Sequence, residues 1–433
     1  MRIAVVGAGI VGVATAYELA CDGHQVTVFE RRASVAVEAS FANAGVVAPG
    51  YVAPWAAPGM LGKVLGQIGR RDAAVRLATL PGPALAGWLW RWWRACAAPR
   101  HLVHRNAMLA LATASQARTR EVAASLAIEH EHASGLLVLL RSERELVRAR
   151  AGLGWMTEHG IAFHLLDAEG CRRTEPALDE ATPLRAGIYQ PGANVGNCRQ
   201  FAIGLKAELM RRGVDFRFGQ SVQRLTPGRP EVIVDSVALA ADTDSAPARP
   251  QLPRSERFDG VIVCAAIESC TLLRPHGLKL PLVPVYGYSI TLPVLKFETY
   301  PDAGPRGALI DERYKVAISR LGDRVRVAGS AELGGTAERM RDAPIATLHR
   351  VLQDWFPNAA RHAQAQAWKG ARPMSPDGPP VIGATGLPGV WVNTGHGSSG
   401  WALACGSARL LADAVAGREP AIDDSRFSPL RWR

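Results

Sequence analysis

Long apolar segments, metal-type cysteine spacings and clusters of one charge are all missing from this chain of 433 residues. No stretch of about 20 uncharged apolar residues occurs, so we expect no membrane-spanning helix. We expect no secretory signal, because glycines interrupt the N-terminal apolar run at once. The seven cysteines form no Cys-x-x-Cys pair and show no metal-ligand spacing, which predicts buried free thiols, no metal site and a cytoplasmic location.

Basic residues exceed acidic ones without being concentrated anywhere. Fifty Lys and Arg against 39 Asp and Glu give a formal charge of +11. Because these charges are scattered, we expect no nucleic-acid partner, and an anionic substrate or an anionic membrane surface agrees better with the excess. The hydrophobic content of 48% is enough for two intertwined domains. No pattern in the sequence predicts an oligomeric state.

Residues 84–94 combine four tryptophans with two arginines. An interfacial helix uses tryptophan and arginine in this way, which would place the protein on the cytoplasmic face of the inner membrane as a peripheral protein. The alternative is an aromatic-rich helix packed on the domain core, and the residues leave both open.

The first thirty residues carry a phosphate-binding fingerprint. A short apolar strand at 1–6 leads into Gly7-Ala8-Gly9-Ile10-Val11-Gly12 and a helical stretch, and a second strand ends at Glu30. Gly7 allows the tight turn, Gly9 lets the backbone approach a pyrophosphate, and Gly12 lets the helix pack closely on the sheet. The helix N-terminus attracts the phosphate charge, and Glu30 can accept hydrogen bonds from a ribose diol. The pattern predicts dinucleotide binding.

The fingerprint by itself does not separate FAD from NAD. Arg31 beside Glu30 adds ambiguity, since an arginine there suits a 2′-phosphate, although Arg31 and Arg32 are equally well read as solvated basic residues. A second glycine-rich turn at 395–400 opens a small-residue helix near the end of the chain. Its positive N-terminus would stabilise the negative charge of a reduced flavin, and an NAD enzyme has no comparable use for it. This second turn favours FAD.

The elements predict an α/β fold: a Rossmann-like FAD-binding domain interleaved with an antiparallel α+β substrate domain. An extended loop is expected at 40–58 and an enlarged, mobile hairpin loop at 235–256. The expected division assigns three segments to the FAD-binding domain and two to the substrate part. The FAD-binding segments are 1–100, 201–275 and 366–433, and the substrate segments are 101–200 (helical) and 276–365 (antiparallel).

Motifs spread over nearly the whole chain resemble those of bacterial D-amino acid dehydrogenases of the small-subunit type. They are the N-terminal fingerprint with Glu30 and the segments 40–45, 49–59, 286–289, 311–318, 370–383 and 393–407. The chain is thus similar to the D-amino acid oxidase-like flavoproteins, which include glycine and sarcosine oxidases. Two features depart from the family pattern: the segment 235–256 is longer than usual, and Ser398-Ser399 differs from that pattern at a position near the flavin.

The resemblance implies noncovalent FAD and oxidative deamination of D-amino acids such as D-alanine to 2-oxo acids and ammonia. Hydride passes from Cα to flavin N5, and electrons then go to a quinone-type acceptor. The absence of cysteine from 367–378 argues against the covalent flavin of sarcosine oxidases. The alternatives are a D-hydroxyproline or other secondary-amine dehydrogenase, an oxidase that uses O2, and a non-catalytic flavin-binding subunit.

The substrate carboxylate needs a cation, and Arg372 is the candidate, with a structural position under the flavin as its alternative. Phenol donors are expected from the tyrosines, and Lys315 is a second candidate cation. His396 is expected near the flavin, where it tunes the ring electrostatically rather than acting as a base, because no carboxylate partner is visible for it. The candidate tyrosines are Tyr286, Tyr288 and Tyr314.

The residues expected to contact FAD lie in five segments of the chain. They are Ile3, Val6, Gly7, Ala8, Gly9, Ile10, Val11, Gly12, Tyr17, Glu30, Arg31, Ser40, Asn43, Ala44, Gly45, Val222, Ala265, Gly395, Gly397 and Ser398.

Overall fold

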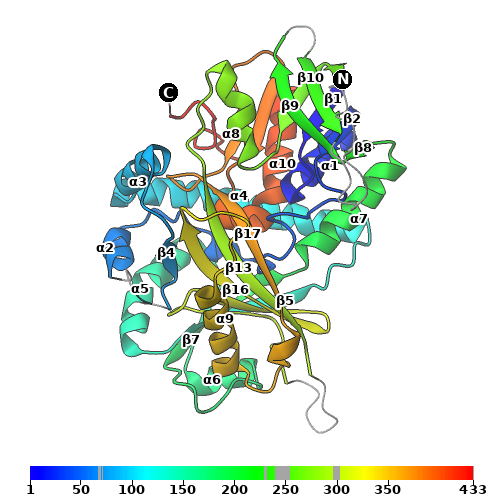
Figure 1. Cartoon of the computed structure of the whole chain (residues 1–433). Helices are drawn as coiled ribbons and strands as arrows, with labels where there is room; N and C mark the ends of the chain where they lie inside the picture. The colour runs from blue at the N-terminus through cyan, green and yellow to red at the C-terminus, as the bar shows by residue number, and fades with distance from the viewer. Residues whose placement is uncertain (67–69, 71, 229–231, 239–253, 296–302, 433) are drawn as a thin grey trace.

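Two large β-sheets organise the computed structural model, which describes residues 1–66, 70, 72–228, 232–238, 254–295 and 303–432. One sheet lies in the upper half of Figure 1 and the other in the lower half. Early, middle and late segments of the chain all contribute to the upper half, as the blue, green and orange-red ribbons show. The predicted interleaving of two domains is therefore what the structure has.

The upper sheet is the cofactor-type sheet that the N-terminal fingerprint predicted. Within the described residues it has six strands, and all neighbours are parallel except the pair at the β18 edge. In spatial order they are β18 (Val381–Ala384), β19 (Val390–Thr394), β12 (Gly260–Val263), β1 (Arg2–Val6), β2 (Gln25–Glu30) and β8 (Asp215–Phe218). A separate antiparallel sheet is formed by β9 (Gln220–Thr226), β10 (Val232–Ala238) and β11 (Arg254–Phe258).

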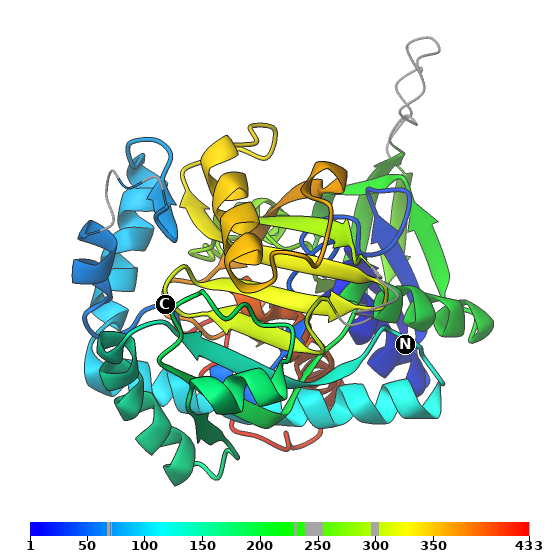
Figure 2. The same ribbon diagram turned by 90° about the horizontal axis from the view of Figure 1, so that it is seen from below.

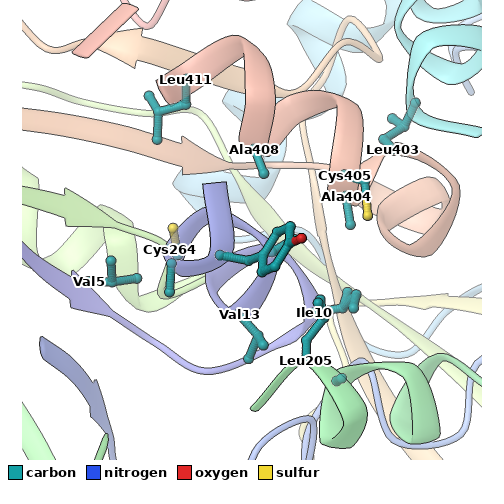
Figure 3. Packing of buried hydrophobic residues seen from close by; sticks show 14 of the residues in the cluster. Val5, Ile10, Val13, Leu205, Cys264, Leu403, Ala404, Cys405, Ala408 and Leu411 are labelled. Carbon is teal, nitrogen blue, oxygen red and sulfur yellow. The ribbon is translucent and has the colours of Figure 1, made fainter. Parts of the chain in front are cut away.

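Four helices pack around the upper sheet: α1 (Ile10–Cys21), α4 (Ala98–Ser125), α7 (Cys198–Arg211) and α10 (Gly400–Ala416). Figure 3 shows the small side chains of Ala404 and Ala408 at the contact between α10 and α1. A Cβ atom at Gly406 would lie 2.7 Å from the Cβ of Ser115, so α10 approaches α4 equally closely. The structure differs here from the expected division, because α4 packs in the core of the cofactor-binding half.

The lower sheet is largely antiparallel, as the alternating pattern of 286–331 predicted. The pairs β5–β14 and β4–β16 are its parallel exceptions. Its main path is β17 (Gln366–Met374), β13 (Val283–Pro293), β16 (Arg324–Leu333), β15 (Val316–Leu321), β14 (Ala308–Asp311), β5 (Ala133–Leu140), β7 (Ala186–Val195) and β3 (Val46–Val47), with β4 (Val75–Leu77) beside β16 and β6 (His164–Leu166) beside β7. β17 belongs to this sheet, although the expected division placed 366–433 in the FAD-binding domain.

The two faces of the lower sheet have different neighbours. Helix α9 (Asp342–Trp355) covers one face, where Ile318 and Val327 join its apolar core. On the opposite face Ser319 Oγ donates to the carbonyl of Ala44 at 2.7 Å, and Arg326 donates to the carbonyl of Asn43 at 3.2 Å. That opposite face therefore lies against the segment predicted to contact the cofactor.

Of the remaining helices, α8 (Glu268–Leu273) packs its buried side chains against the upper sheet and the others lie at the periphery. Figure 2 shows α4 running beneath the molecule with the early helices at its left. The peripheral helices are α2 (Met60–Leu65), α3 (Pro83–Ala95), α5 (Glu143–Glu158) and α6 (Ala168–Thr174), and the short 3-10 turns are η1 (Pro49–Tyr51), η2 (Arg274–His276), η3 (His362–Gln364) and η4 (Gly397–Ser399). Among the described residues no helix is long and apolar enough to cross a membrane.

Two expected loops are partly ordered. The segment 40–58 contains β3 and η1, and the ends of 235–256 belong to β10 and β11. Residues 239–253 lie outside the described part of the chain, so the predicted mobile loop falls mostly there. The Trp-rich segment forms α3, whose two faces differ: Trp88 and Trp92 are buried, and Trp90 and Trp93 are 58% and 48% exposed.

Candidate cofactor and substrate sites

Three glycines shape the first turn, and each has a different reason to be glycine. Gly7 has a φ of +103°, and a Cβ there would lie 2.7 Å from the carbonyl oxygen of Cys264. A Cβ at Gly12 would lie 1.9 Å from the carbonyl oxygen of Gly7. At Gly9 the nearest atom would be Ser40 Oγ at 3.5 Å, an ordinary contact, and the backbone is extended with φ −65°. The fold requires glycine at 7 and 12 but leaves room at 9, so a ligand is the reason for Gly9.

Polar groups gather around this turn at the carboxyl end of β1. Glu30 accepts hydrogen bonds from the backbone N–H groups of Ala8 at 2.7 Å and Arg32 at 2.8 Å, and Ser40 Oγ accepts from the N–H of Ile10 at 3.1 Å. Burial raises the pKa of Glu30, and the two backbone hydrogen bonds oppose that shift. Both side chains are thus held at the N-terminus of α1, within reach of a nucleotide that binds there.

Arg31 is occupied by acidic partners. Its guanidinium lies 2.6 Å from Glu38 and 2.9 Å from Glu268. Two carboxylates already balance this charge, which favours an ion-pair role over contact with a 2′-phosphate.

The segment from Asn43 to Gly45 is fixed from both sides. Asn43 Oδ1 accepts from the N–H of Gly45 at 2.9 Å, and Trp401 Nε1 donates to the carbonyl of Gly45 at 3.2 Å. Gly45 has a φ of +75°, and a Cβ there would lie 2.7 Å from the carbonyl oxygen of Gly196. Its neighbour Ala44 is anchored to the lower sheet by Ser319, so this segment joins the two halves of the molecule.

The second glycine turn holds a buried, neutral histidine. Gly395 and Gly397 have positive φ values of 76° and 57°, and Ser398 follows in η4 before α10. Burial lowers the pKa of His396 to about 3. Ser407 Oγ lies 3.0 Å from His396 Nε2 and donates its own proton to the carbonyl of Ala404. Since a hydroxyl has one proton, His396 Nε2 must carry the proton in this contact.

The other predicted cofactor residues are distributed along the cofactor-binding half. Ile3 and Val6 are buried in β1, and Ala265 follows β12, where its carbonyl accepts from the N–H of Glu268. Tyr17 lies farther along α1, in the core, with the guanidinium groups of Arg118 and Arg212 about its ring. Val222 lies within β9.

Arg372 lies on β17 as a cation that the protein surrounds closely but that keeps part of its surface accessible. Its Nη1 donates to the carbonyl of Ser330 at 2.9 Å, and its guanidinium covers Gly287 of β13. Burial lowers the pKa of Arg372 to about 10, so the side chain keeps its charge at neutral pH. Ser330 has a positive φ of 59°, a conformation that non-glycine residues adopt rarely and that is often found at functional sites.

The three candidate tyrosines do not lie with Arg372. Lys369, three residues before it on β17, lies with its Nζ 4.6 Å from the ring of Tyr286 and 5.2 Å from that of Tyr288. Side chains alternate along a strand, so residues three apart face opposite sides of the sheet. The Tyr288 hydroxyl donates to Glu332 at 2.6 Å, and Tyr314 packs against the core under α9. Tyr286 and Tyr288 therefore lie on the opposite face of the sheet from Arg372, and Tyr314 lies in the turn after β14.

Lys315 contacts Tyr51, which was not among the tyrosines predicted from the sequence. Its Nζ donates to Glu312, and its side chain also contacts the hydroxyl of Tyr51 in η1. Burial raises the pKa of Tyr51 to about 12, although 37% of the residue is exposed.

Comparison with known proteins identifies the family. The family model described as FAD dependent oxidoreductase matches residues 2–414. The chain belongs to this family. It is 41% identical to the D-amino acid dehydrogenase of Methylobacterium sp. (strain 4-46), over 100% of this chain and 99% of that protein. It is 38% identical to the D-amino acid dehydrogenase of Rhizobium rhizogenes (strain K84), over 100% of both.

Solved structures extend the likeness at the level of the fold. The glycine oxidase of Geobacillus kaustophilus superposes with a TM-score of 0.73 at 20% identity, covering 99% of each chain. Together, the comparisons confirm the predicted fold class, the predicted FAD cofactor and the resemblance to D-amino acid dehydrogenases.

The residues of this FAD dependent oxidoreductase fit the cofactor. The open position at Gly9 provides the backbone approach that a pyrophosphate needs, and the Glu30 carboxylate suits a ribose diol. The groups proposed to hold the flavin end come from Asn43–Gly45 and the turn at 395–398, and they converge through Trp401, whose indole binds Gly45 from α10.

Proposed function

We propose that this FAD dependent oxidoreductase is a D-amino acid dehydrogenase that converts D-alanine-like substrates to 2-oxo acids and ammonia, with Arg372 as the carboxylate site. The assignment of the carboxylate site depends on one observation, the closely surrounded guanidinium of Arg372. Burial lowers the pKa of this group to about 10. A cation that has lost part of its hydration is stabilised when an anionic ligand binds beside it. The two D-amino acid dehydrogenases described above support the choice of substrate.

The chain's own groups bind and orient the substrate. When bound, FAD supplies the hydride acceptor. Arg372 holds the carboxylate by charge-assisted hydrogen bonds and thereby fixes the position of Cα. Loss of a hydride from Cα and a proton from nitrogen leaves an imino acid, which water converts to the 2-oxo acid and ammonia. His396 stays neutral, so it adds no positive charge to the buried turn before α10.

We further propose a quinone-type acceptor reached at an anionic membrane surface through α3. This helix is anchored by Trp88, whose Nε1 donates to the carbonyl of Met374 at 3.0 Å. Its other face presents Trp90 and Trp93, whose ring centroids are 5.1 Å apart, beside the exposed side chains of Arg91 and Arg94. Exposed indoles with flanking cations suit the headgroup region of an anionic bilayer.

An anaerobic titration of the flavin tests the reaction. The purified holoprotein is mixed with D-alanine, L-alanine or D-proline, and then with a quinone analogue or air. We expect D-alanine to bleach the flavin, L-alanine to leave it oxidised, and the quinone to reoxidise it faster than air does. Bleaching by the cyclic imino acid alone would replace the assignment with a secondary-amine dehydrogenase. If no amine bleaches the flavin, the proposed function is wrong.

A further inference from the structure

Two glycines face each other across strands β13 and β17 on the sheet face that carries Arg372. Gly287 and Gly370 are direct partners in the antiparallel register. Neither glycine has a positive φ, so backbone conformation does not explain why glycine is present. What they share is a side chain lying on top of them: Arg372 on Gly287 and Trp368 on Gly370.

The overlying groups are in close contact with the glycines. A Cβ at Gly287 would lie 2.2 Å from Arg372 Nη2, and a Cβ at Gly370 would lie 2.0 Å from Trp368 Cη2. Any larger residue at either position would displace the guanidinium or the indole. Because neither glycine has a side chain, the guanidinium and the indole can pack directly on the backbone of the sheet. We call this pair, Gly287 and Gly370, the glycine floor.

The glycine floor places a cation and an aromatic ring on the same face of the sheet, above two directly opposed glycines. Arg372 is partly accessible and Trp368 is partly exposed, so both groups can contact a ligand. Both are on the face away from α9, the same face as Ser319 and Arg326, which bind the Asn43–Ala44 segment.

We propose that Trp368 is the residue that selects the substrate side chain, and that D-amino acids with apolar side chains, branched or aromatic, are favoured over those with acidic or short ones. The proposal rests on the proposed function, in which Arg372 binds the carboxylate. The carboxylate and the side chain of an amino acid are bonded to the same carbon, Cα. A substrate held by Arg372 therefore directs a second group to the neighbouring surface, and that surface is the indole of Trp368.

The chemistry of the indole sets the preference. Burying a Leu- or Phe-sized side chain against an apolar surface strengthens binding by roughly tenfold to a hundredfold relative to leaving it in water. A single methyl group gains only a small fraction of this. An acidic side chain would lose hydration against the ring without gaining a partner there.

The test compares substrates in the FAD-loaded enzyme. We expect Trp368→Ala to lower kcat/KM for D-leucine and D-phenylalanine by about tenfold or more, with less than a threefold change for D-alanine. Trp368→Phe should restore most of the loss, because it keeps an aromatic surface. Gly370→Ala should reproduce the substrate-dependent loss, because its Cβ occupies the position of the indole.

A binding measurement separates recognition from chemistry. Propanoate and 3-phenylpropanoate lack the amine, so they bind without being oxidised, and a flavin absorbance titration reports their affinity. In Trp368→Ala the advantage of 3-phenylpropanoate over propanoate should disappear. FAD content and the thermal unfolding midpoint show whether the variant is folded.

The outcomes distinguish this proposal from the proposed function. If D-alanine bleaches the wild-type flavin but Trp368→Ala affects all substrates equally or none, the role of Trp368 in selection is wrong and the dehydrogenase assignment stands. If D-alanine and the other D-amino acids leave the wild-type flavin oxidised, the proposed function itself is wrong.

Discussion

Substituting the second and third glycines of the N-terminal fingerprint separates glycine required by the ligand from glycine required by the fold. A Cβ at Gly9 would be 3.5 Å from the nearest atom, Ser40 Oγ, whereas one at Gly12 would be 1.9 Å from the carbonyl oxygen of Gly7. Gly9→Val should therefore leave the apoprotein folded and abolish flavin retention, because the side chain would occupy the approach of the pyrophosphate. Gly12→Ala is the matched control and should destabilise the apoprotein.

The magnitudes follow from these distances. Gly9→Val loses about two hydrogen bonds to a charged group at about 1.5–3 kcal/mol each, which weakens FAD binding by about a hundredfold to ten-thousandfold. Its cost to folding should stay within about 1 kcal/mol, since the N-cap position of α1 is extended and uncrowded. Gly12→Ala forces a backbone displacement and should cost about 3 kcal/mol or more.

The assay is urea unfolding of each apoprotein followed by fluorescence titration with FAD. A Gly9→Val protein that is yellow and stoichiometric after purification would refute the ligand role of Gly9. A Gly12→Ala protein as stable as the wild type would refute the distinction between the two glycines.

Three further perturbations test other parts of the site. Arg372→Leu should raise the KM for D-alanine about a hundredfold or more with unchanged FAD content, since charge-assisted hydrogen bonds are lost; unaltered saturation would place the carboxylate elsewhere. Burial lowers the pKa of His396 from 6.5 to about 3, so the unfolded state binds a proton that the folded state does not, and stability falls as the pH falls through this window. His396→Gln should reduce the pH dependence of the free energy of unfolding by up to about 1.4 kcal/mol per pH unit. The measurement is urea unfolding of the apoprotein at pH 6.5 and 4.5. If the wild type and the variant show the same pH dependence, the imidazole is not buried in its neutral form. On anionic vesicles at low salt, flotation should fall in Trp90→Ser/Trp93→Ser and persist in the control Met210→Ser, whose exposed side chain is on α7; a wild type that fails to float would exclude α3 as a docking surface.

The parts of the site that could be predicted from sequence are those made by local chain geometry. The turn from Gly7 to Gly12 is contained within one strand–turn–helix unit, so its spacing alone specifies how it folds. The same is true of the turn before α10, where Gly395 and Gly397 both adopt positive φ.

The arrangement of side chains across the lower sheet could not be predicted in this way. Tyr286 and Tyr288 flank Gly287 and share one face of β13, and whether Arg372 lies on that face depends on the pairing with β17, more than 80 positions later in the chain. The register between β13 and β16 also shifts between Tyr286 and Tyr288, which local periodicity does not reveal. Tyr51 was missed because its contact with Lys315 joins segments far apart in the chain, and Trp368 was missed because the face that it shares with Arg372 follows from the strand pairing.

Strand β17 carries two cations, Lys369 and Arg372, whose partners differ in charge. This difference argues for a functional role of Arg372. On the face under α9, Lys369 lies 3.0 Å from the buried carboxylate of Glu332, with both side chains almost fully buried. On the other face, Arg372 has a carbonyl of Ser330 as its hydrogen-bond partner, and burial lowers its pKa. A buried charge whose partner is a neutral carbonyl costs stability, and replacement by an apolar side chain of similar size is often neutral or stabilising. Arg372→Leu should therefore raise the unfolding midpoint of the substrate-free protein or leave it unchanged, whereas Lys369→Leu should lower it by leaving Glu332 buried with one cation fewer. If Arg372 has its proposed role, a substrate carboxylate would supply on one face of the strand the charge that Glu332 supplies permanently on the other.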